Sequence, residues 1–182
     1  MEHSTPFEAL TREQVDRVVA AVDGITPVYV YSEDYIVKQI QALKASFQAG
    51  REDQITIRYA VKALSNVSIL KIFDREGIHF DCSSVYEVLR VIKAGIDPVK
   101  IEMVSQELTK AQLDLLRPVK GIERMQFVAS SPHQLDLLLA DDKFKSQVSG
   151  LRVNPGFGSG YHSKTVVAGP KYSFGIWHEN LN

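Results

Sequence analysis

Lys62, Asp81 and Arg152 each follow a β-rich run and precede a predicted loop. The carboxyl ends of parallel strands meet on one rim of an α/β barrel, and such barrels keep their chemistry on that rim. If the three residues share it, a cation, a carboxylate and a guanidinium could together bind a phosphorylated, ring-shaped cofactor. Lys62 could also attack a carbonyl carbon, because a lysine amine is a nucleophile when it is neutral.

Each of the three residues also has an ordinary structural interpretation. Lys62 could be a solvated charge at the end of a strand, since most lysines stay exposed. Asp81 could cap a helix or a turn, and Arg152 could form a surface ion pair. Their common placement favours the functional interpretation.

A glycine-rich loop over residues 154–165 follows the Arg152 strand. Its glycines are spaced G-x-G-x-G rather than G-x-G-x-x-G, and Ser163 precedes Lys164 where a P-loop needs glycine. The loop is therefore predicted to be a lid or a substrate-gripping segment, with His162 and Lys164 as candidate substrate contacts. Both could equally be solvated loop residues. The five histidines show no metal-ligand spacing, so no metal is expected.

Residues 55–62 are the stretch that must position the lysine. Large β-forming side chains alternate along it with other residues, which is the period of a strand with one buried face. That face would carry Ile55, Ile57, Tyr59 and Val61. Lys62 would then lie on the other face, beside Ala60, at the carboxyl end of the strand.

Strand and helix patterns alternate with short connections from residue 55 onward. The predicted strands are residues 55–62, 78–82, 101–104, 124–128 and 148–154. Regular alternation of this kind implies a parallel sheet and favours a β/α barrel over a doubly wound sheet. A complete barrel has eight strands in about 250 residues. We therefore expect an α/β fold, a partial (β/α)8 TIM-type barrel with about five parallel strands.

The chain before residue 55 contains two predicted helices. Thr11 begins a capping box with Gln14, ahead of a stripe of valines. A short strand is predicted at residues 28–31, and Ser32 would cap the second helix. We accordingly divide the chain into an N-terminal lead-in helix, residues 1–26, and a barrel domain, residues 27–182.

Composition excludes several classes of partner. The chain has 45% apolar and 24% charged residues and a formal net charge of −1, so it has no basic field to attract nucleic acid or anionic lipid. A single cysteine, Cys82, cannot form an internal disulfide. No apolar run reaches the length of a membrane span, and no signal pattern opens the sequence. We expect a cytoplasmic protein.

Five strands of an eight-stranded barrel cannot close on themselves. The strands that carry Lys62 and Arg152 would each have an unpaired edge, and part of an apolar barrel interior would face water. We therefore expect the chain either to pair with a second copy or to be a trimmed piece of a longer protein.

Several short segments resemble one family of enzymes. Residues 58–66, RYAVKALSN, resemble the cofactor-lysine segment of the fold-type III pyridoxal-phosphate decarboxylases, which share the alanine-racemase-type barrel. Residues 80–87, FDCSSVYE, resemble the motif on the next strand of that family. The segments LRVNPGFG at 151–158 and FGIW at 174–177 are similar to the diaminopimelate decarboxylase branch more than to the ornithine or arginine branches.

The resemblance implies an alanine-racemase-like N-terminal barrel domain that binds pyridoxal 5'-phosphate. It makes Lys62 the catalytic lysine that bonds to the cofactor and places Asp81 and Arg152 around the cofactor ring. Ser83, Ser84 and Glu87 would support them. Pyridoxal phosphate holds the electron pair that remains when a carboxylate leaves as carbon dioxide.

The implied activity is decarboxylation of meso-2,6-diaminopimelate to L-lysine and carbon dioxide by a homodimer. Two alternatives remain open. The chain could belong to a decarboxylase of a related basic amino acid, of the ornithine, arginine or carboxynorspermidine type. It could instead be a pyridoxal-phosphate-binding barrel protein without catalytic activity.

Several elements of the family have no counterpart in these 182 residues. They include the histidine strand, the glycine-rich phosphate loop, the glutamate that pairs with the pyridine nitrogen, and the C-terminal β-domain with its catalytic cysteine. Cys82 lies inside the Asp81 motif and is not that cysteine. We therefore expect the chain alone to bind the cofactor weakly and to be inactive.

Overall fold

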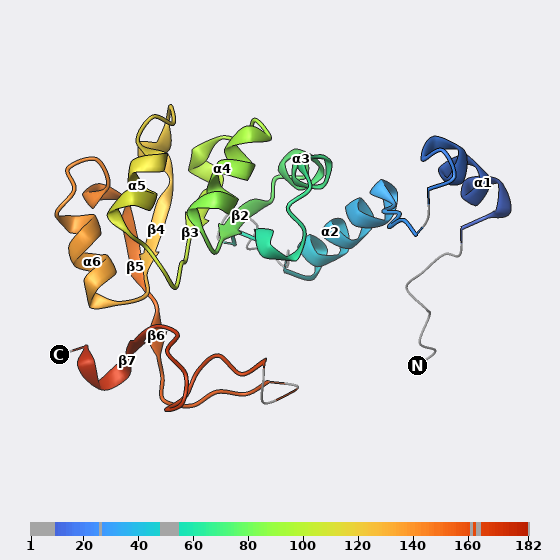
Figure 1. The fold of residues 1–182 in the computed structure, drawn as a ribbon. Helices are drawn as coiled ribbons and strands as arrows, with labels where there is room; N and C mark the ends of the chain where they lie inside the picture. Colours follow the sequence, from blue (N-terminus) through green and yellow to red (C-terminus); the bar gives the residue numbers. More distant parts are fainter. Residues whose placement is uncertain (1–9, 26, 48–54, 161, 163–164, 182) are drawn as a thin grey trace.

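Five parallel strands form one sheet, in the order β1-β2-β3-β4-β5 (Figure 1). The computed structural model describes residues 10–25, 27–47, 55–160, 162 and 165–181. The strands are β1 (Arg58–Ala60), β2 (His79–Cys82), β3 (Ile101–Met103), β4 (Gln126–Ala129) and β5 (Val148–Leu151). The helices between them are α3 (Val67–Arg75), α4 (Val85–Lys93), α5 (Lys110–Leu116) and α6 (Pro132–Leu139). The order in space equals the order in the chain, as in part of a β/α barrel, so the predicted α/β arrangement of five parallel strands is confirmed.

One face of the sheet packs against the helices and forms the apolar core. Alternate side chains of the three central strands are at most 1% exposed on this face, and they contact buried residues of α4 and α5. These side chains are Phe80, Cys82, Ile101, Met103, Phe127 and Ala129. Short 3-10 turns lead into the last three strands: η3 (Pro98–Lys100), η4 (Ile122–Arg124) and η5 (Lys145–Gln147). Because successive side chains of a strand point to opposite faces, the residues between these buried ones lie on the other face of the sheet, which we call the inner face.

The inner face is polar, which corrects the expectation of an apolar barrel interior. Arg58 and Glu102 lie on it with their side chains only 28% and 22% exposed. His79 and Asp81 lie between them on β2, and Gln126 follows on β4. The strands alternate apolar and polar residues, and here the polar set faces the barrel axis while the apolar set faces the helices.

Strand β1 is shorter than the sequence predicted. It ends at Ala60, and Val61–Ala63 form the 3-10 turn η2. Lys62 thus lies in a turn just after the strand and not on the strand itself. The turn forms because Val61 is fully buried in the core and the hydroxyl of Tyr59 donates to the Leu64 carbonyl at 3.1 Å.

Helix α1 (Arg12–Ala21) begins as predicted, with the Thr11–Gln14 capping box in place. None of its residues is buried. The valine stripe therefore contacts solvent, and Figure 1 shows α1 lying apart from the sheet. None of the helices in the described ranges is long and apolar enough to cross a bilayer.

Residues 28–31, predicted as a strand, have no regular secondary structure. No strand pairs with them in the part of the chain that the structure describes, and Tyr29 is 91% exposed. Favourable residue types do not suffice for a strand when the backbone has no partner. Helix α2 (Glu33–Phe47) follows, and the Ser32 hydroxyl accepts from the Tyr35 amide at 3.2 Å as predicted.

The predicted fifth strand, residues 148–154, divides into two. β5 ends at Leu151, and β6 (Val153–Asn154) pairs in parallel with β7 (Ile176–Trp177), a strand that the sequence did not predict. β6 and β7 form a separate sheet, so β5 gains no second neighbour from this pairing. Within the described residues, β1 and β5 are both edge strands with a single neighbour, as expected.

We predict that Phe127→Ala lowers the free energy of unfolding by about 3–5 kcal/mol, because it leaves a cavity in the core. Phe127 is 1% exposed, and its ring packs edge-on against Phe144 at 5.7 Å. Urea denaturation followed by circular dichroism measures the change. Phe157→Ala is the control, since Phe157 is 76% exposed. Equal losses in the two variants would contradict the placement of the core.

Candidate active site

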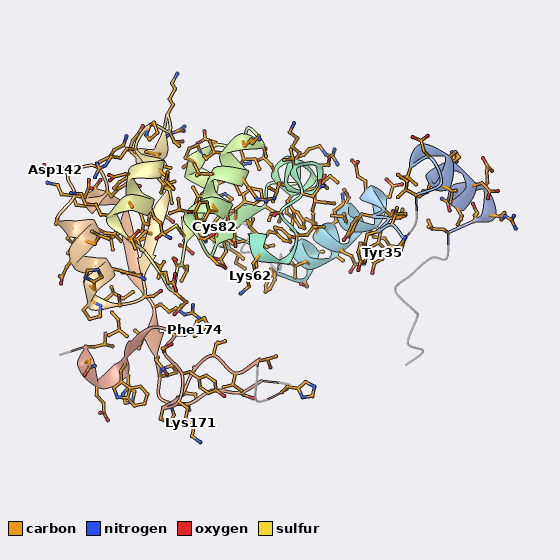
Figure 2. All side chains as sticks on the ribbon, viewed as in Figure 1. Tyr35, Lys62, Cys82, Asp142, Lys171 and Phe174 are labelled. Carbon is orange, nitrogen blue, oxygen red and sulfur yellow. The ribbon has the colours of Figure 1, made fainter. Side chains whose placement is uncertain are left out.

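Lys62 is exposed on the carboxyl side of β1. Figure 2 shows it projecting on the side of the sheet away from α4 and α5, the side on which Phe174 also lies. The chain that follows its turn is held by two side-chain hydrogen bonds. Asn66 caps α3 by accepting from the Ser68 amide at 2.9 Å, and Arg90 of α4 donates to the Ser65 hydroxyl at 3.2 Å. Lys62 is therefore a solvent-accessible amine on a fixed turn.

Asp81 lies on the neighbouring strand, opposite Ala60 in the β1–β2 register. Its oxygen Oδ1 is buried and has no hydrogen-bond partner among the described residues. Burial raises the pKa of the Asp81 carboxyl, and the charges of Lys62, Arg152 and Arg58 oppose that increase. The charges of Lys62 and Arg152 therefore both act on the Asp81 carboxyl. The three sequence-predicted residues thus influence one another electrostatically.

Arg152 lies between β5 and β6 and is fixed through its backbone and its side chain. Its amide donates to the Ala129 carbonyl at 2.8 Å, and its carbonyl accepts from the Ile176 amide at 2.7 Å. The guanidinium carbon lies 4.8 Å from the centre of the Phe174 ring, a cation–π distance. The backbone of residue 175 also passes close to that of Arg152, which only glycine permits. The φ of Gly175 is +85°, and a Cβ there would lie 2.7 Å from the Arg152 carbonyl oxygen.

The residues predicted to support the site form the start of α4. The Ser84 hydroxyl accepts from the Glu87 amide at 3.3 Å, and a carboxylate oxygen of Glu87 accepts from the Ser83 amide at 2.8 Å. This reciprocal pair satisfies two backbone donors at the helix start. It fixes the path of the chain immediately after Asp81.

The glycine-rich loop is tied at its base by Asn154, which the sequence reasoning did not single out. The buried Asn154 amide nitrogen donates to the carbonyls of Gly169 and Tyr172 at 3.2 and 3.0 Å. Its oxygen accepts from the amides of Gly156 and Gly169 at 3.1 and 2.9 Å. One side chain therefore joins the beginning and the end of the loop.

The two limbs of the loop lie against each other above this base. A Cβ on Gly158 would lie 2.4 Å from the Ala168 carbonyl oxygen, closer than any side chain tolerates. His162 is exposed, and its backbone exchanges hydrogen bonds of 3.2 and 2.8 Å with the Thr165 hydroxyl. Lys164, the other predicted substrate contact, lies outside the described residues.

The assembled residues fit an anionic ring-shaped ligand with a reactive carbonyl. Lys62 offers an accessible amine, Arg152 a guanidinium on a fixed backbone, and Asp81 a buried oxygen that still lacks a donor. An unpartnered buried carboxylate oxygen is costly. A ligand that donates to it would remove that cost.

Sequence reasoning also missed the polar side chains beneath Asp81. Arg58 and Glu102 stand at alternate positions of strands whose other residues are apolar. That alternation was the available signal, because a polar residue within a strand of a covered sheet needs a polar partner.

Comparison with known proteins assigns these residues to one family. The family described as pyridoxal-dependent decarboxylase, pyridoxal binding domain, matches residues 33–182. A diaminopimelate decarboxylase of Streptomyces coelicolor is 32% identical over 170 residues, which cover 89% of this chain and 34% of the relative. The diaminopimelate decarboxylase of Escherichia coli K12 is 32% identical over 185 residues, which cover 94% of this chain and 38% of the relative. The chain thus spans little more than a third of the length of these curated relatives.

Solved structures support the same fold. A crystal structure of diaminopimelate decarboxylase matches with a TM-score of 0.69 and 28% identity, covering 97% of this chain and 38% of that one. The Helicobacter pylori diaminopimelate decarboxylase complexed with L-lysine matches with a TM-score of 0.69 and 22% identity, covering 90% and 40%. These likenesses confirm the α/β fold class.

We predict that Asp81→Asn stabilises the protein at neutral pH. The folded state raises the pKa of Asp81, mainly by burial. The unfolded state therefore ionises this carboxyl more readily, and ionisation lowers stability as pH rises from the ordinary aspartate value through the folded value. Asparagine removes that loss.

The melting temperatures of the two proteins between pH 3 and pH 8 test this. The advantage of Asp81→Asn should be largest at the upper end and vanish below about pH 4, where aspartate is protonated in both states. An advantage that is constant with pH, or a loss of stability at pH 7, would contradict the buried, unpartnered carboxylate.

Proposed function

This chain belongs to the pyridoxal-dependent decarboxylases through their pyridoxal binding domain, and from that premise we propose that it binds pyridoxal 5'-phosphate and serves in amino-acid decarboxylation. The observation that carries the proposal is the accessible Lys62 amine, whose charge acts on the half-buried Asp81 carboxyl with its one buried, unpartnered oxygen. We assign cofactor binding to residues 27–182 and regard residues 1–26 as a separate lead-in.

Lys62 would hold the cofactor covalently through its amine, which must be neutral when it attacks. Bound pyridoxal phosphate would supply an electron sink for the electron pair left when the substrate carboxylate departs as carbon dioxide. Asp81 would accept a hydrogen bond or a proton from a group bound beside it. Arg152 would bring a positive charge to the cofactor's oxygen atoms, its place fixed by the Phe174 ring.

The substrate that we propose is meso-2,6-diaminopimelate, with L-lysine and carbon dioxide as products. The name carried by the relatives at 32% identity supports this choice. We also propose that the active protein is a cytoplasmic homodimer and that further strands complete the barrel. The edge position of β1 supports the last point.

The loop over residues 156–169 is proposed to be a lid that excludes water from the site. It begins four residues after Arg152, and Asn154 ties both its ends. A tied base with a glycine-rich tip allows the tip to move while its attachment stays fixed. His162 and Lys164 would meet the substrate when such a lid closes.

We predict that Lys62→Ala abolishes covalent labelling by pyridoxal phosphate, because the nucleophile is lost. The chain is incubated with the cofactor, reduced with sodium borohydride, and searched for the modified peptide by mass spectrometry. In the complete gene product, carbon dioxide release from meso-2,6-diaminopimelate should fall by several orders of magnitude. Lys62→Arg should not restore either property.

Lys71→Arg is the matched control, since Lys71 is an exposed lysine of the following helix. It should leave labelling and turnover at the wild-type level. Labelling that persists in Lys62→Ala, or near-normal turnover by that variant, would refute the assignment of Lys62.

We predict that Gly158→Ala changes kcat and KM together while leaving cofactor affinity within about twofold. The added Cβ would overlap the Ala168 carbonyl oxygen and force the limbs of the loop apart. Gly150→Ala is the control, because a Cβ at Gly150 meets only Val128, at 3.9 Å. Steady-state kinetics and cofactor titration measure the two effects. Loss of cofactor with normal kinetics after resupply would show that the loop is not a lid.

A further inference from the structure

A network of three side chains crosses the inner face of the sheet below Asp81. The Arg58 guanidinium donates through Nη2 to the side-chain oxygen of Gln126 at 3.2 Å. Its Nε is buried without a hydrogen-bond partner and forms an ion pair with a carboxylate oxygen of Glu102 at 3.5 Å. The network joins the edge strand β1 to β3 and β4, passing over β2.

The register determines where the guanidinium must lie. Arg58 is level with His79 on β2, while Asp81 is level with Glu102 on β3. An arginine that starts beside His79 and ends at Glu102 has to cross β2 diagonally, between His79 and Asp81. Ala60, the residue opposite Asp81, has only a methyl group and leaves room for this path.

The network holds the guanidinium in one place. Arg58 has two partners on two different strands, and its side chain is 28% exposed. One hydrogen bond and one ion-pair contact restrict the guanidinium, which stays charged at every accessible pH. Arg58 is therefore a permanent positive charge at a fixed position below the carboxylate.

We propose that Arg58 is a positioning residue for Asp81: Glu102 and Gln126 hold its guanidinium beneath the cofactor site, where its charge favours the ionised carboxylate. The relation of this pair to a cofactor rests on the proposed function. The charge relation between Arg58 and Asp81 does not, because it is built from the described side chains alone.

Lys62 and Arg152 also favour the ionised Asp81 carboxylate, and more strongly than Arg58 does. Their circumstances differ from those of Arg58. Lys62 must be neutral when it acts as a nucleophile, so its positive charge is absent when the proposed chemistry needs it. Arg152 follows β5, which lies at the other end of the sheet from β1, and its guanidinium lies over the Phe174 ring. Glu102 is level with Asp81 on β3 and carries the opposite charge to Arg58.

The direction of the pKa shifts agrees with the geometry. Burial raises the pKa of Asp81, and the charge of Arg58 lowers it, together with those of Lys62 and Arg152. Burial lowers the pKa of His79, and Arg58 and Lys100 lower it further, while Asp74 raises it. The guanidinium thus acts on both residues of β2 that flank its path.

The test is the titration of the Asp81 carboxyl by carbon-13 NMR on the 182-residue chain without cofactor, with the resonance assigned from Asp81→Asn. In Arg58→Gln, which keeps amide donors but removes the charge, the midpoint should rise by about half a pH unit or more. Arg58→Lys keeps the charge and should restore most of the difference. In Glu102→Gln the midpoint should fall, because a nearby negative charge is lost and Arg58 is free to approach Asp81.

A higher Asp81 midpoint in Arg58→Gln and a lower one in Glu102→Gln would show a charge effect. Loosened structure would instead lower the midpoint in both variants, because it would expose Asp81 to water. Arg75→Gln is the matched control, since Arg75 pairs with Glu33 on the helical side of the molecule and should leave Asp81 unchanged. If Arg58→Gln fails to fold by circular dichroism, Arg58→Met takes its place: a raised midpoint supports the proposal, and an unchanged or lowered one overturns it.

An unchanged midpoint in folded Arg58→Gln, or downward shifts in both variants, would also overturn the proposal. The outcome is independent of the proposed function, because no cofactor is present in the titration. Failure of Lys62 labelling with the expected Asp81 shifts would refute the proposed function and leave the role of Arg58 intact.

Discussion

The half-buried carboxylate of Asp81, with its oxygen Oδ1 fully enclosed, is the constraint on which the site depends. Its oxygen lacks a partner within the described residues, and ionised groups are strongly disfavoured away from water unless other charges compensate them. Lys62, Arg152 and Arg58 supply that compensation from three directions. The cost of keeping this group in place is an expected feature of a binding site, where proteins give up stability for function.

The sheet makes this arrangement possible because it has two chemically different faces. The helix-facing side chains form a closed apolar core, and this core fixes the strands without help from the inner face. Polar residues can therefore occupy the inner face of neighbouring strands and meet one another there. The loop after β5 adds the last component, since Asn154 and Gly175 fix the chain on both sides of Arg152.

Much of this could be predicted from the sequence because it depends on local signals. Helix caps such as Thr11 and Ser32, and the β–α alternation after residue 55, gave the elements and their parallel order. The grouping of Lys62, Asp81 and Arg152 followed from strand ends alone. The end of β1 at Ala60 did not, because it depends on where Val61 packs. The sequence could not show that residues 28–31 lack a strand partner, although their residue types favour a strand. It also could not show the contact between Arg58 and Gln126, because these residues are 68 positions apart.

The central claim is that Lys62 holds a cofactor whose surroundings are Asp81 and Arg152. A crystal structure of this protein grown with pyridoxal phosphate tests it most directly. The account predicts continuous electron density from the Lys62 amine to the cofactor, with a ligand atom within hydrogen-bond distance of the Asp81 carboxylate. Cofactor density at another lysine, or at Lys62 but turned away from both Asp81 and Arg152, would contradict it.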